Sequence, residues 1–165
     1  MNNTLPSQNM SIFTTLLGKR ITSVKRQLFK HDMDLPGYEQ NADGPIQFII
    51  NDGSIVHFIA DTETFSIGIV SGEMPRFGSS YELRDVSNNS FWSGKVGQEI
   101  KQIALLKSKD WSKDYPCEFG IELSFSYGET ALIEYLDEED YPDMIKVADH
   151  YTGQPCIVQL VDSCR

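Results

Sequence analysis

A hairpin pattern that occurs twice is the feature that most constrains the fold of this chain. Residues 46–50 place apolar side chains at every second position, Asp52-Gly53 follows, and an apolar run over 55–60 returns. Residues 121–136 repeat the arrangement around a turn at Tyr127-Gly128. Asp-Gly between two apolar runs is a strong hairpin signal, because both residues tolerate the positive φ of tight turns. Alternation of apolar and polar residues indicates sheets with one solvated face.

A second shared motif suggests that the two hairpins belong to a duplicated unit. Residues 17–21 read LGKRI and residues 96–100 read VGQEI, and each motif precedes one of the hairpins. The separation between matching positions is 79 residues at this motif (17 to 96) and 75 at the hairpin (46 to 121). The alternative is chance similarity between two amphipathic hairpins, and the sequence leaves it open.

These patterns predict one β-rich α+β domain over residues 1–165, made of two repeated antiparallel β-hairpin units with a few short helices. A chain of 165 residues fits a single domain of about 100–200 residues. We expect the first repeat at about 12–70, an irregular connecting segment at 71–90 and the second repeat at about 91–161. One short helix is expected over 11–17, because Gly18 follows it as a C-terminal glycine.

The net charge of −10 is concentrated in the second half of the chain. Residues 117–150 contain ten acidic side chains and a single basic one, Lys146, which gives 1 − 10 = −9. Direct nucleic-acid binding is therefore not expected, because it needs clustered Lys and Arg. An acidic surface favours a basic partner, whose approach it accelerates by electrostatic steering. The alternative is that the charge only keeps the protein soluble.

No motif in the sequence indicates catalysis or metal binding. The histidines His31, His57 and His150 lack metal-ligand spacing with cysteine or with one another. Glycine-rich phosphate loops and the GxSxG elbow are absent. We therefore expect no catalytic residue, no metal, no cofactor and no enzyme activity. An enzyme built from scattered acids and His57 stays an alternative.

The predicted partner-binding surface consists of an acidic run, Asp137–Asp140 followed by Asp143, and of its aromatic neighbours. Tyrosine and tryptophan in polar surroundings are typical anchors of protein interfaces. Trp92 fits such a role less well, because it is more simply explained as the side chain that docks the connecting segment onto the second repeat. The predicted partner-binding residues are Trp111, Glu134, Tyr135, Asp137, Glu138, Glu139, Asp140, Tyr141 and Asp143.

The remaining sequence features favour a cytoplasmic location. No basic segment followed by an apolar core stands at the N-terminus, and no apolar run is long enough to span a bilayer. The three cysteines, Cys117, Cys156 and Cys164, form no CxxC pair, and an odd number argues against a disulfide framework.

The LGKRI motif, the loop that follows and the hairpin at Asp52-Gly53 resemble small bacterial immunity-type proteins of polymorphic toxin systems. The resemblance extends loosely over 12–70 and 91–148. It implies a protein that binds and neutralises one cognate toxin, such as a basic nuclease or another cytosol-acting enzyme, with no membrane partner. A different hypothesis is a small-molecule or peptide-binding module with a pocket between the two repeats. The sequence does not determine the oligomeric state.

Overall fold

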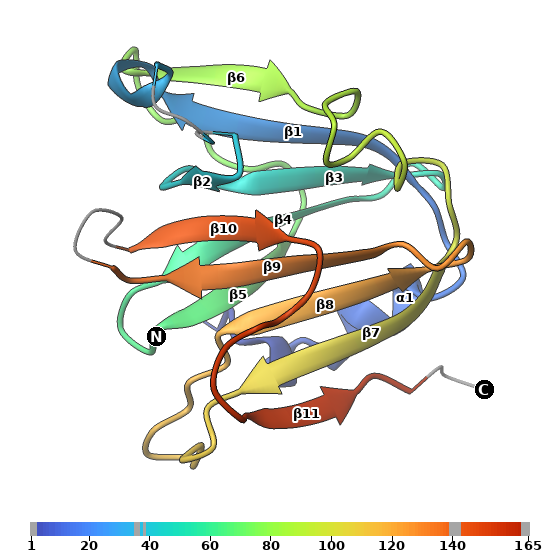
Figure 1. Cartoon of the computed structure of the whole chain (residues 1–165), viewed down its shortest axis with the longest axis vertical. Helices are drawn as coiled ribbons and strands as arrows, with labels where there is room; N and C mark the ends of the chain where they lie inside the picture. The colour runs from blue at the N-terminus through green and yellow to red at the C-terminus, as the bar shows by residue number, and fades with distance from the viewer. Residues whose placement is uncertain (1–2, 35–36, 38, 139–142, 163–165) are drawn as a thin grey trace.

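Two antiparallel sheets face each other in the computed structural model, which describes residues 3–34, 37, 39–138 and 143–162 (Figure 1). The prediction of a β-rich α+β fold with few short helices is confirmed. The first sheet has the strand order β5-β4-β3-β1-β6. Its strands are β1 (Ile21–Phe29), β3 (Ile46–Ile50), β4 (Ile55–Asp61), β5 (Ser66–Ser71) and β6 (Tyr81–Asp85).

The second sheet has the order β11-β7-β8-β9-β10-β2, so one strand from the first half of the chain extends it. That strand is β2 (Asn41–Ala42), which pairs with β10. The other strands are β7 (Ile100–Lys107), β8 (Gly120–Phe125), β9 (Thr130–Leu136), β10 (Met144–Ala148) and β11 (Ile157–Leu160).

The helical elements are short and lie in the N-terminal part of the chain. They are η1 (Pro6–Gln8), α1 (Met10–Leu16) and η2 (Lys30–Asp32). The expected helix over 11–17 coincides with α1, and Gly18 follows it with a φ of 82°. The chain leaves the helix at Leu17, which is extended with ψ 131°. Gly18 then occupies the left-handed position of the turn in which the Lys19 N–H donates to the Leu16 carbonyl at 3.1 Å, a conformation that glycine adopts without a steric penalty.

Corresponding strands of the two sheets pair in the same register. Ile21 of β1 lies opposite Ile50 of β3, and the register shifts between Ile21 and Ser23. In the second sheet, Ile100 of β7 lies opposite Phe125 of β8, and a shift follows at the corresponding position. The turns agree as well, since Gly53 and Gly128 have φ values of 88° and 90°. The two hairpins thus share their pattern of strand pairing and the conformation of their turns.

The segment 71–90, which we expected to be an irregular connection, contains β6. This strand pairs with β1, as β11 pairs with β7 in the other sheet. The Val86 N–H donates to the Val24 carbonyl at 2.9 Å, and the Val161 N–H donates to the Ile103 carbonyl at the same distance. The sequence YELRD of β6 is short and has only two apolar side chains, Tyr81 and Leu83, and no residue of this edge strand is buried. Its pattern was therefore too weak to predict a strand.

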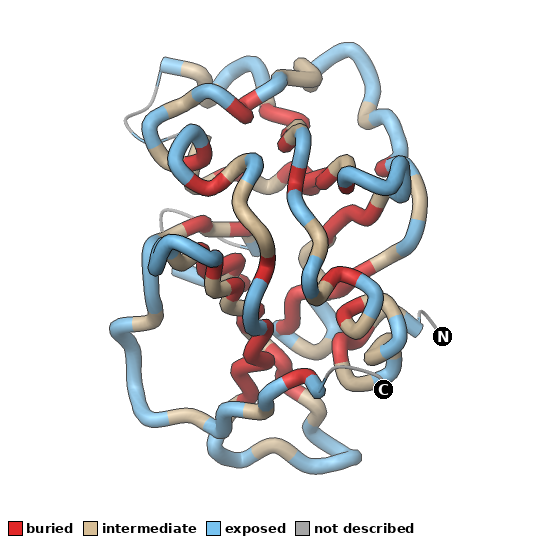
Figure 2. The backbone as a smooth tube through the Cα atoms, turned by 90° about the vertical axis from the view of Figure 1, so that its right-hand side faces the viewer, coloured by how far each residue is buried: buried red, intermediate tan, exposed pale blue. Residues whose placement is uncertain are grey.

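The core lies between the sheets and is formed by inward-facing residues of both. Figure 2 shows the buried stretches within the strands and the exposed ones in the connections. Trp92 is 2% exposed, and its ring centroid lies 5.5 Å from that of Phe48. This tryptophan therefore docks its segment onto the core, but against Phe48 of the first sheet, whereas the sequence analysis expected it to dock onto the second repeat. Phe13 and Leu16 of α1 belong to the same core.

Arg26 connects the sheets inside the protein. Its side chain is 1% exposed, and its guanidinium donates hydrogen bonds to the backbone carbonyls of Glu39, Gln40, Ala42 and Ile145. Burial lowers the pKa of Arg26, but the carbonyls stabilise the charged form by hydrogen bonding. The side chain thereby joins β1 to β2 and β10.

Candidate functional site

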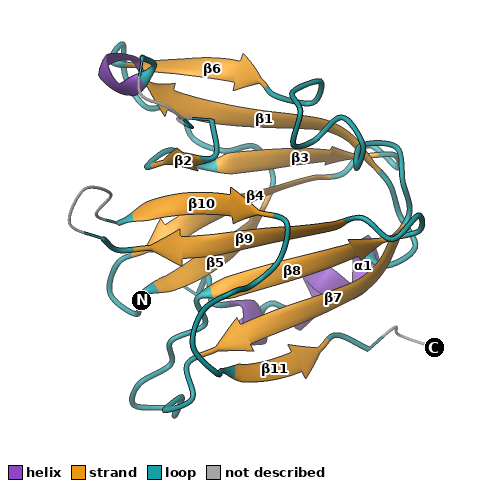
Figure 3. Ribbon diagram, in the orientation of Figure 1, coloured by secondary structure: helices purple, strands orange, loops and turns teal. Residues whose placement is uncertain are grey.

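The connection between β10 and β11, residues 149–156, crosses the outer face of the second sheet (Figure 3). At its start, the Lys95 ammonium lies 3.4 Å from Asp149, and the Thr130 hydroxyl donates to the Asp149 carbonyl at 2.5 Å. Further along, the Tyr151 ring packs against Phe119 with centroids 5.3 Å apart. Two pockets border this connection.

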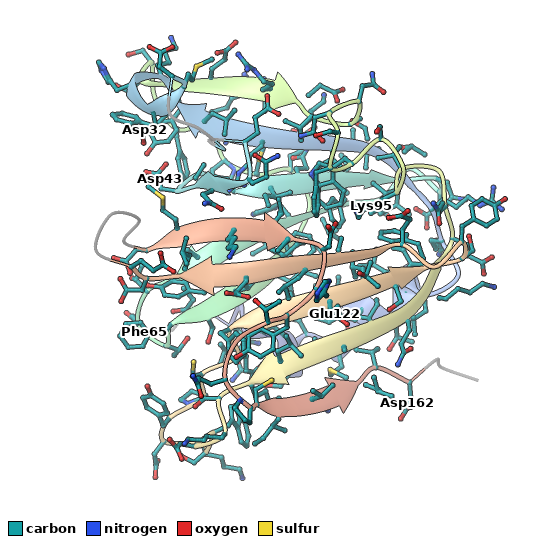
Figure 4. The ribbon with its side chains drawn as sticks, in the orientation of Figure 1. Asp32, Asp43, Phe65, Lys95, Glu122 and Asp162 are labelled. Carbon is teal, nitrogen blue, oxygen red and sulfur yellow. The ribbon has the colours of Figure 1, made fainter. Side chains whose placement is uncertain are left out.

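The first of these, here called the apolar pocket, has a volume of about 580 Å³. Ligand sites in proteins commonly have volumes of about 300–1,000 Å³ and apolar walls. Phe65 reaches this pocket from the turn between β4 and β5 (Figure 4), whereas the other lining residues come from the second half of the chain. The lining residues are Phe65, Ser108, Lys109, Cys117, Phe119, Tyr135, Asp137, Tyr151, Gln154, Pro155 and Cys156.

The second, here called the acidic pocket, has a volume of about 410 Å³. Glu134 of β9 lies opposite Lys146 of β10 in its wall. Burial raises the pKa of Glu134, Lys146 lowers it, and Glu138 raises it again. The lining residues are Glu134, Glu138, Lys146, Ala148, Asp149, His150, Thr152 and Gly153.

One short segment at the end of β9 borders both pockets. Tyr135 and Asp137 line the apolar pocket, while Glu134 and Glu138 line the acidic one. The segment 134–138 thus contributes the ring of Tyr135 and the carboxylate of Asp137 to the apolar pocket, and the carboxylates of Glu134 and Glu138 to the acidic pocket. The chain thus joins a hydrophobic cavity to a negatively charged one.

Tyr135 and Asp143 are brought together by a hydrogen bond from the tyrosine hydroxyl to the carboxylate. The position of Tyr135 differs from the expectation of an exposed contact residue, because the ring is 7% exposed and belongs to the core. Burial and the neighbouring Asp143 raise the pKa of Tyr135. Asp143 is exposed and has a φ of 52°.

Trp111 is held by side chains outside the acidic run. Its indole N–H donates to the Glu118 carboxylate at 3.1 Å, and the Lys107 ammonium lies 4.4 Å from its ring centroid. Glu118 is fully buried and also accepts hydrogen bonds from the backbone and hydroxyl of Ser7 at 2.7 and 2.6 Å. Trp111 is half-buried, so it differs from the freely exposed anchor that its polar neighbours predicted.

Asp137 and Glu138 are exposed, as the predicted interface requires. Three other predicted interface residues, Glu139, Asp140 and Tyr141, lie outside the described residues. The described part of the acidic run therefore consists of the two exposed carboxylates after β9 and Asp143 before β10.

The histidines do not converge on a site. His57 is 5% exposed, and its Nδ1 lies 2.8 Å from the Gly72 carbonyl, so it holds the connection that follows β5. His150 lines the acidic pocket. Within the described ranges, no group of His, Cys, Asp or Glu side chains has the arrangement of a metal site.

The space between the sheets, where a pocket was expected, is filled by side chains. The side chains that fill it are fully buried and include Phe48 and Phe58 from the first sheet and Ile121 and Leu123 from the second. The apolar pocket lies instead at one end of the second sheet, and Phe65 alone among its lining residues belongs to the first half.

Several residues of the apolar pocket were not predicted from the sequence, namely Phe65, Cys117, Phe119, Tyr151 and Cys156. Burial is the main cause that raises the pKa of the Cys156 thiol, and the carboxylates of Glu122 and Glu134 raise it further. Glu122 lies on the outer face of the second sheet (Figure 4). The aromatic residues gave a signal, since Tyr151 occurs in a polar loop. Their convergence depends on tertiary packing that no local pattern encodes.

Comparison of the chain with protein-family models, curated proteins and solved structures finds no match. None of the helices in the described part of the chain has the length and apolar character that a membrane span requires.

Proposed function

We propose that this protein is an immunity-type protein that binds and neutralises a cognate toxin in the cytoplasm. The observation that carries the proposal is the segment 134–138, which borders the apolar and acidic pockets at once. Interfaces commonly combine a central apolar anchor with charged surroundings that steer the partner. A partner side chain entering the apolar pocket would thus be flanked by basic groups that meet the acidic pocket.

The resemblance of the LGKRI and hairpin motifs to immunity proteins supports this proposal. The similar strand registers of the two hairpins favour an internal duplication, which supports it as well. The partner is a basic protein, because like charges across an interface cost several kcal/mol. Occlusion of a basic catalytic or nucleic-acid-binding cleft is the mode of inhibition that this charge favours. Binding requires no catalytic residue, metal or cofactor.

The proposal is tested by affinity capture from lysate of the protein's own host, followed by a toxicity assay. A variant with Asp137→Asn, Glu138→Gln, Glu139→Gln and Asp140→Asn removes the acidic run. The matched control removes four exposed acids elsewhere, by Glu63→Gln, Glu73→Gln, Asp110→Asn and Asp114→Asn. We expect the wild-type and the control protein to capture one basic partner in a salt-sensitive manner.

The captured partner is then expressed alone or with each variant. We expect the partner alone to stop growth, and the wild type and the control to restore it. The acidic-run variant is expected to bind the purified partner with an affinity at least tenfold lower. Equal protection by the acidic-run variant would place the interface elsewhere. A partner that does not impair growth would rule out neutralisation.

A second candidate function is binding of a small molecule or peptide, which the volume and apolar lining of the apolar pocket favour. A ligand that binds only the folded state raises the melting temperature by an amount that grows with the logarithm of its concentration above Kd. An occupant would also shield Cys156 in the pocket wall from alkylation. Thermal stabilisation together with slower Cys156 alkylation, in the absence of any protein, supports this candidate.

A further inference from the structure

The outer edge of β11 differs from the other three sheet edges. Unpaired edge strands expose N–H and C=O groups that can pair with another chain, and proteins usually protect them. The edge of β5 is covered, since the N–H groups of Ile67 and Ile69 donate to the carbonyls of Glu118 and Thr4 at 3.0 and 2.8 Å. The edge strand β2 is only two residues long.

The remaining two edges, β6 and β11, occupy corresponding positions in their sheets. Glu82 corresponds to Ile157 and Asp85 to Leu160, because β6 pairs with β1 as β11 pairs with β7. In β6, Arg84 forms ion pairs with Glu39 and Glu82 at 3.4 and 3.3 Å, which leaves a charged edge. Charged side chains are a common protection of edge strands.

The strand β11 lacks this protection. Its sequence IVQL contains no charge, and Ile157, Val158 and Leu160 are 42%, 57% and 52% exposed. In this protein of net charge −10, β11 is thus an uncharged, apolar and exposed edge, whereas the likewise uncharged edge of β5 is covered. Because like charges are absent from this edge, a second copy can approach it without the repulsion that its other surfaces would cause.

The backbone orientation of β11 fixes the register of such a contact. The Val161 N–H points to β7, where it bonds the Ile103 carbonyl. Since N–H groups alternate along a strand, those of Ile157 and Gln159 also face β7, and those of Val158 and Leu160 face outward. The outward residues are therefore the ones that can pair with another strand.

We propose that β11 mediates homodimerisation by antiparallel pairing with β11 of a second copy. A two-fold axis perpendicular to the sheet at Gln159 places Val158 opposite Leu160 of the second copy. These residues exchange their outward N–H and C=O groups, and their apolar side chains meet on the same face. The two six-stranded sheets thereby become one continuous sheet.

The contact is small compared with a standard interface of about 800 Å² per partner. The dimer is therefore expected to dissociate on dilution. Salt strengthens it, because screening weakens the repulsion between two acidic chains. The toxin complex proposed above responds in the opposite direction, so the two proposals can fail separately.

The experiment is sedimentation equilibrium of the full chain over a range of concentrations and salt. The variant Ile157→Glu with Leu160→Asp gives β11 the two acidic charges of β6, and the control Tyr127→Glu with Asn88→Asp adds the same charge at exposed positions elsewhere. We expect the wild type and the control to dimerise alike and the β11 variant to have a dimer Kd at least tenfold higher. Unchanged circular dichroism shows that the variant is folded.

A second measurement tests the register. In a Cys156→Ser, Cys164→Ser background, Gln159→Cys places a thiol on the proposed axis, where paired Cα atoms lie about 4.5 Å apart, within the range for a disulfide. We expect mild oxidation to give a covalent dimer, whereas Asn88→Cys gives none. A wild-type chain that stays monomeric at every concentration and salt, or a β11 variant that dimerises like the control, would overturn the proposal.

Discussion

The Gly18 N–H donates to the Ile100 carbonyl at 2.8 Å, which links the end of α1 to the start of β7. The reciprocal bond runs from the Gly97 N–H to the Ile21 carbonyl at 2.9 Å. The segments LGKRI and VGQEI therefore pair with each other through two reciprocal backbone hydrogen bonds. Both glycines have positive φ, 82° and 90°, so each motif depends on a conformation that other residues rarely adopt.

Replacing either glycine by alanine is expected to destabilise the protein by about 1–2 kcal/mol, the cost of a left-handed conformation for a residue with a Cβ. The measurement is the free energy of unfolding in urea for Gly18→Ala and Gly97→Ala. The control is Gly94→Ala, because Gly94 has open space around it and no left-handed φ. Equal stability of all three variants would contradict this account.

Removing the carboxylate of Glu118 is expected to destabilise the protein by about 3 kcal/mol, since its buried hydrogen-bond donors then lose their charged acceptor. The donors are Ser7 and Trp111, so Glu118→Ala also frees the indole. Urea unfolding and the tryptophan emission maximum measure both effects. Glu129→Ala, at an exposed position, should change neither. An unshifted emission of Glu118→Ala would show that Trp111 is held by other contacts.

Loss of the Arg26 guanidinium is expected to cost about 3 kcal/mol, because it leaves buried carbonyls of β2 and β10 without donors. Arg26→Met keeps much of the side-chain volume, so the measured change in unfolding free energy reports the lost hydrogen bonds. Arg20→Met, at an exposed position, is the matched control and should lie within about 0.5 kcal/mol of wild type. Equal stability of the two variants would contradict the role of Arg26.

Tyr81 is expected to titrate late in an alkaline titration. Burial, and the hydrogen bond from its hydroxyl to Asp43 at 2.6 Å, raise the pKa of Tyr81 to about 12 from 10.0. A raised pKa in the folded state means that this group stabilises the protein fully below pH 10 and loses its contribution as the pH rises towards 12.

The absorbance change at the phenolate wavelength measures this titration. Tyr81→Phe should remove a late-titrating component, while Tyr127→Phe, at a position that is 86% exposed, should leave that component unchanged. The stability of Tyr81→Phe should also depend less on pH between 10 and 12. A late-titrating component of unchanged size in Tyr81→Phe would show that the contact with Asp43 does not persist in solution.

The alternation of apolar residues over 46–50 and 121–125 was enough to predict the hairpins, because a buried sheet face imposes a period of two. The same period carried a signal about Tyr135, since Ala131, Ile133 and Tyr135 share one face of β9 and all are buried. Its aromatic character had suggested exposure instead. Whether a residue stands at an odd or an even position along the strand decides on which face of the sheet its side chain lies.

The pockets could not be predicted, because their walls come from distant parts of the chain. Phe65 and Tyr151 line the same pocket, although most strands of the second sheet lie between them in the sequence. The contact between Trp111 and Glu118 was hidden for a different reason, because the two are only seven residues apart but are brought together by an irregular loop after β7, which has no periodic pattern. Local periodicity in the sequence predicts strands, whereas the residues that line a surface pocket depend on how the connecting loops cross the sheet.

The pairing of β2 with β10 has a consequence for how the chain is made. When a ribosome has released only the first half, β2 has no strand to pair with, and Arg26 lacks the Ile145 carbonyl that it contacts in the finished molecule. The inner face of the first sheet is also uncovered until the second sheet arrives. Such long-range contacts slow folding and make it cooperative. We therefore expect the nascent chain to stay protease-sensitive until β10 has emerged, and then to gain protection in a single late step.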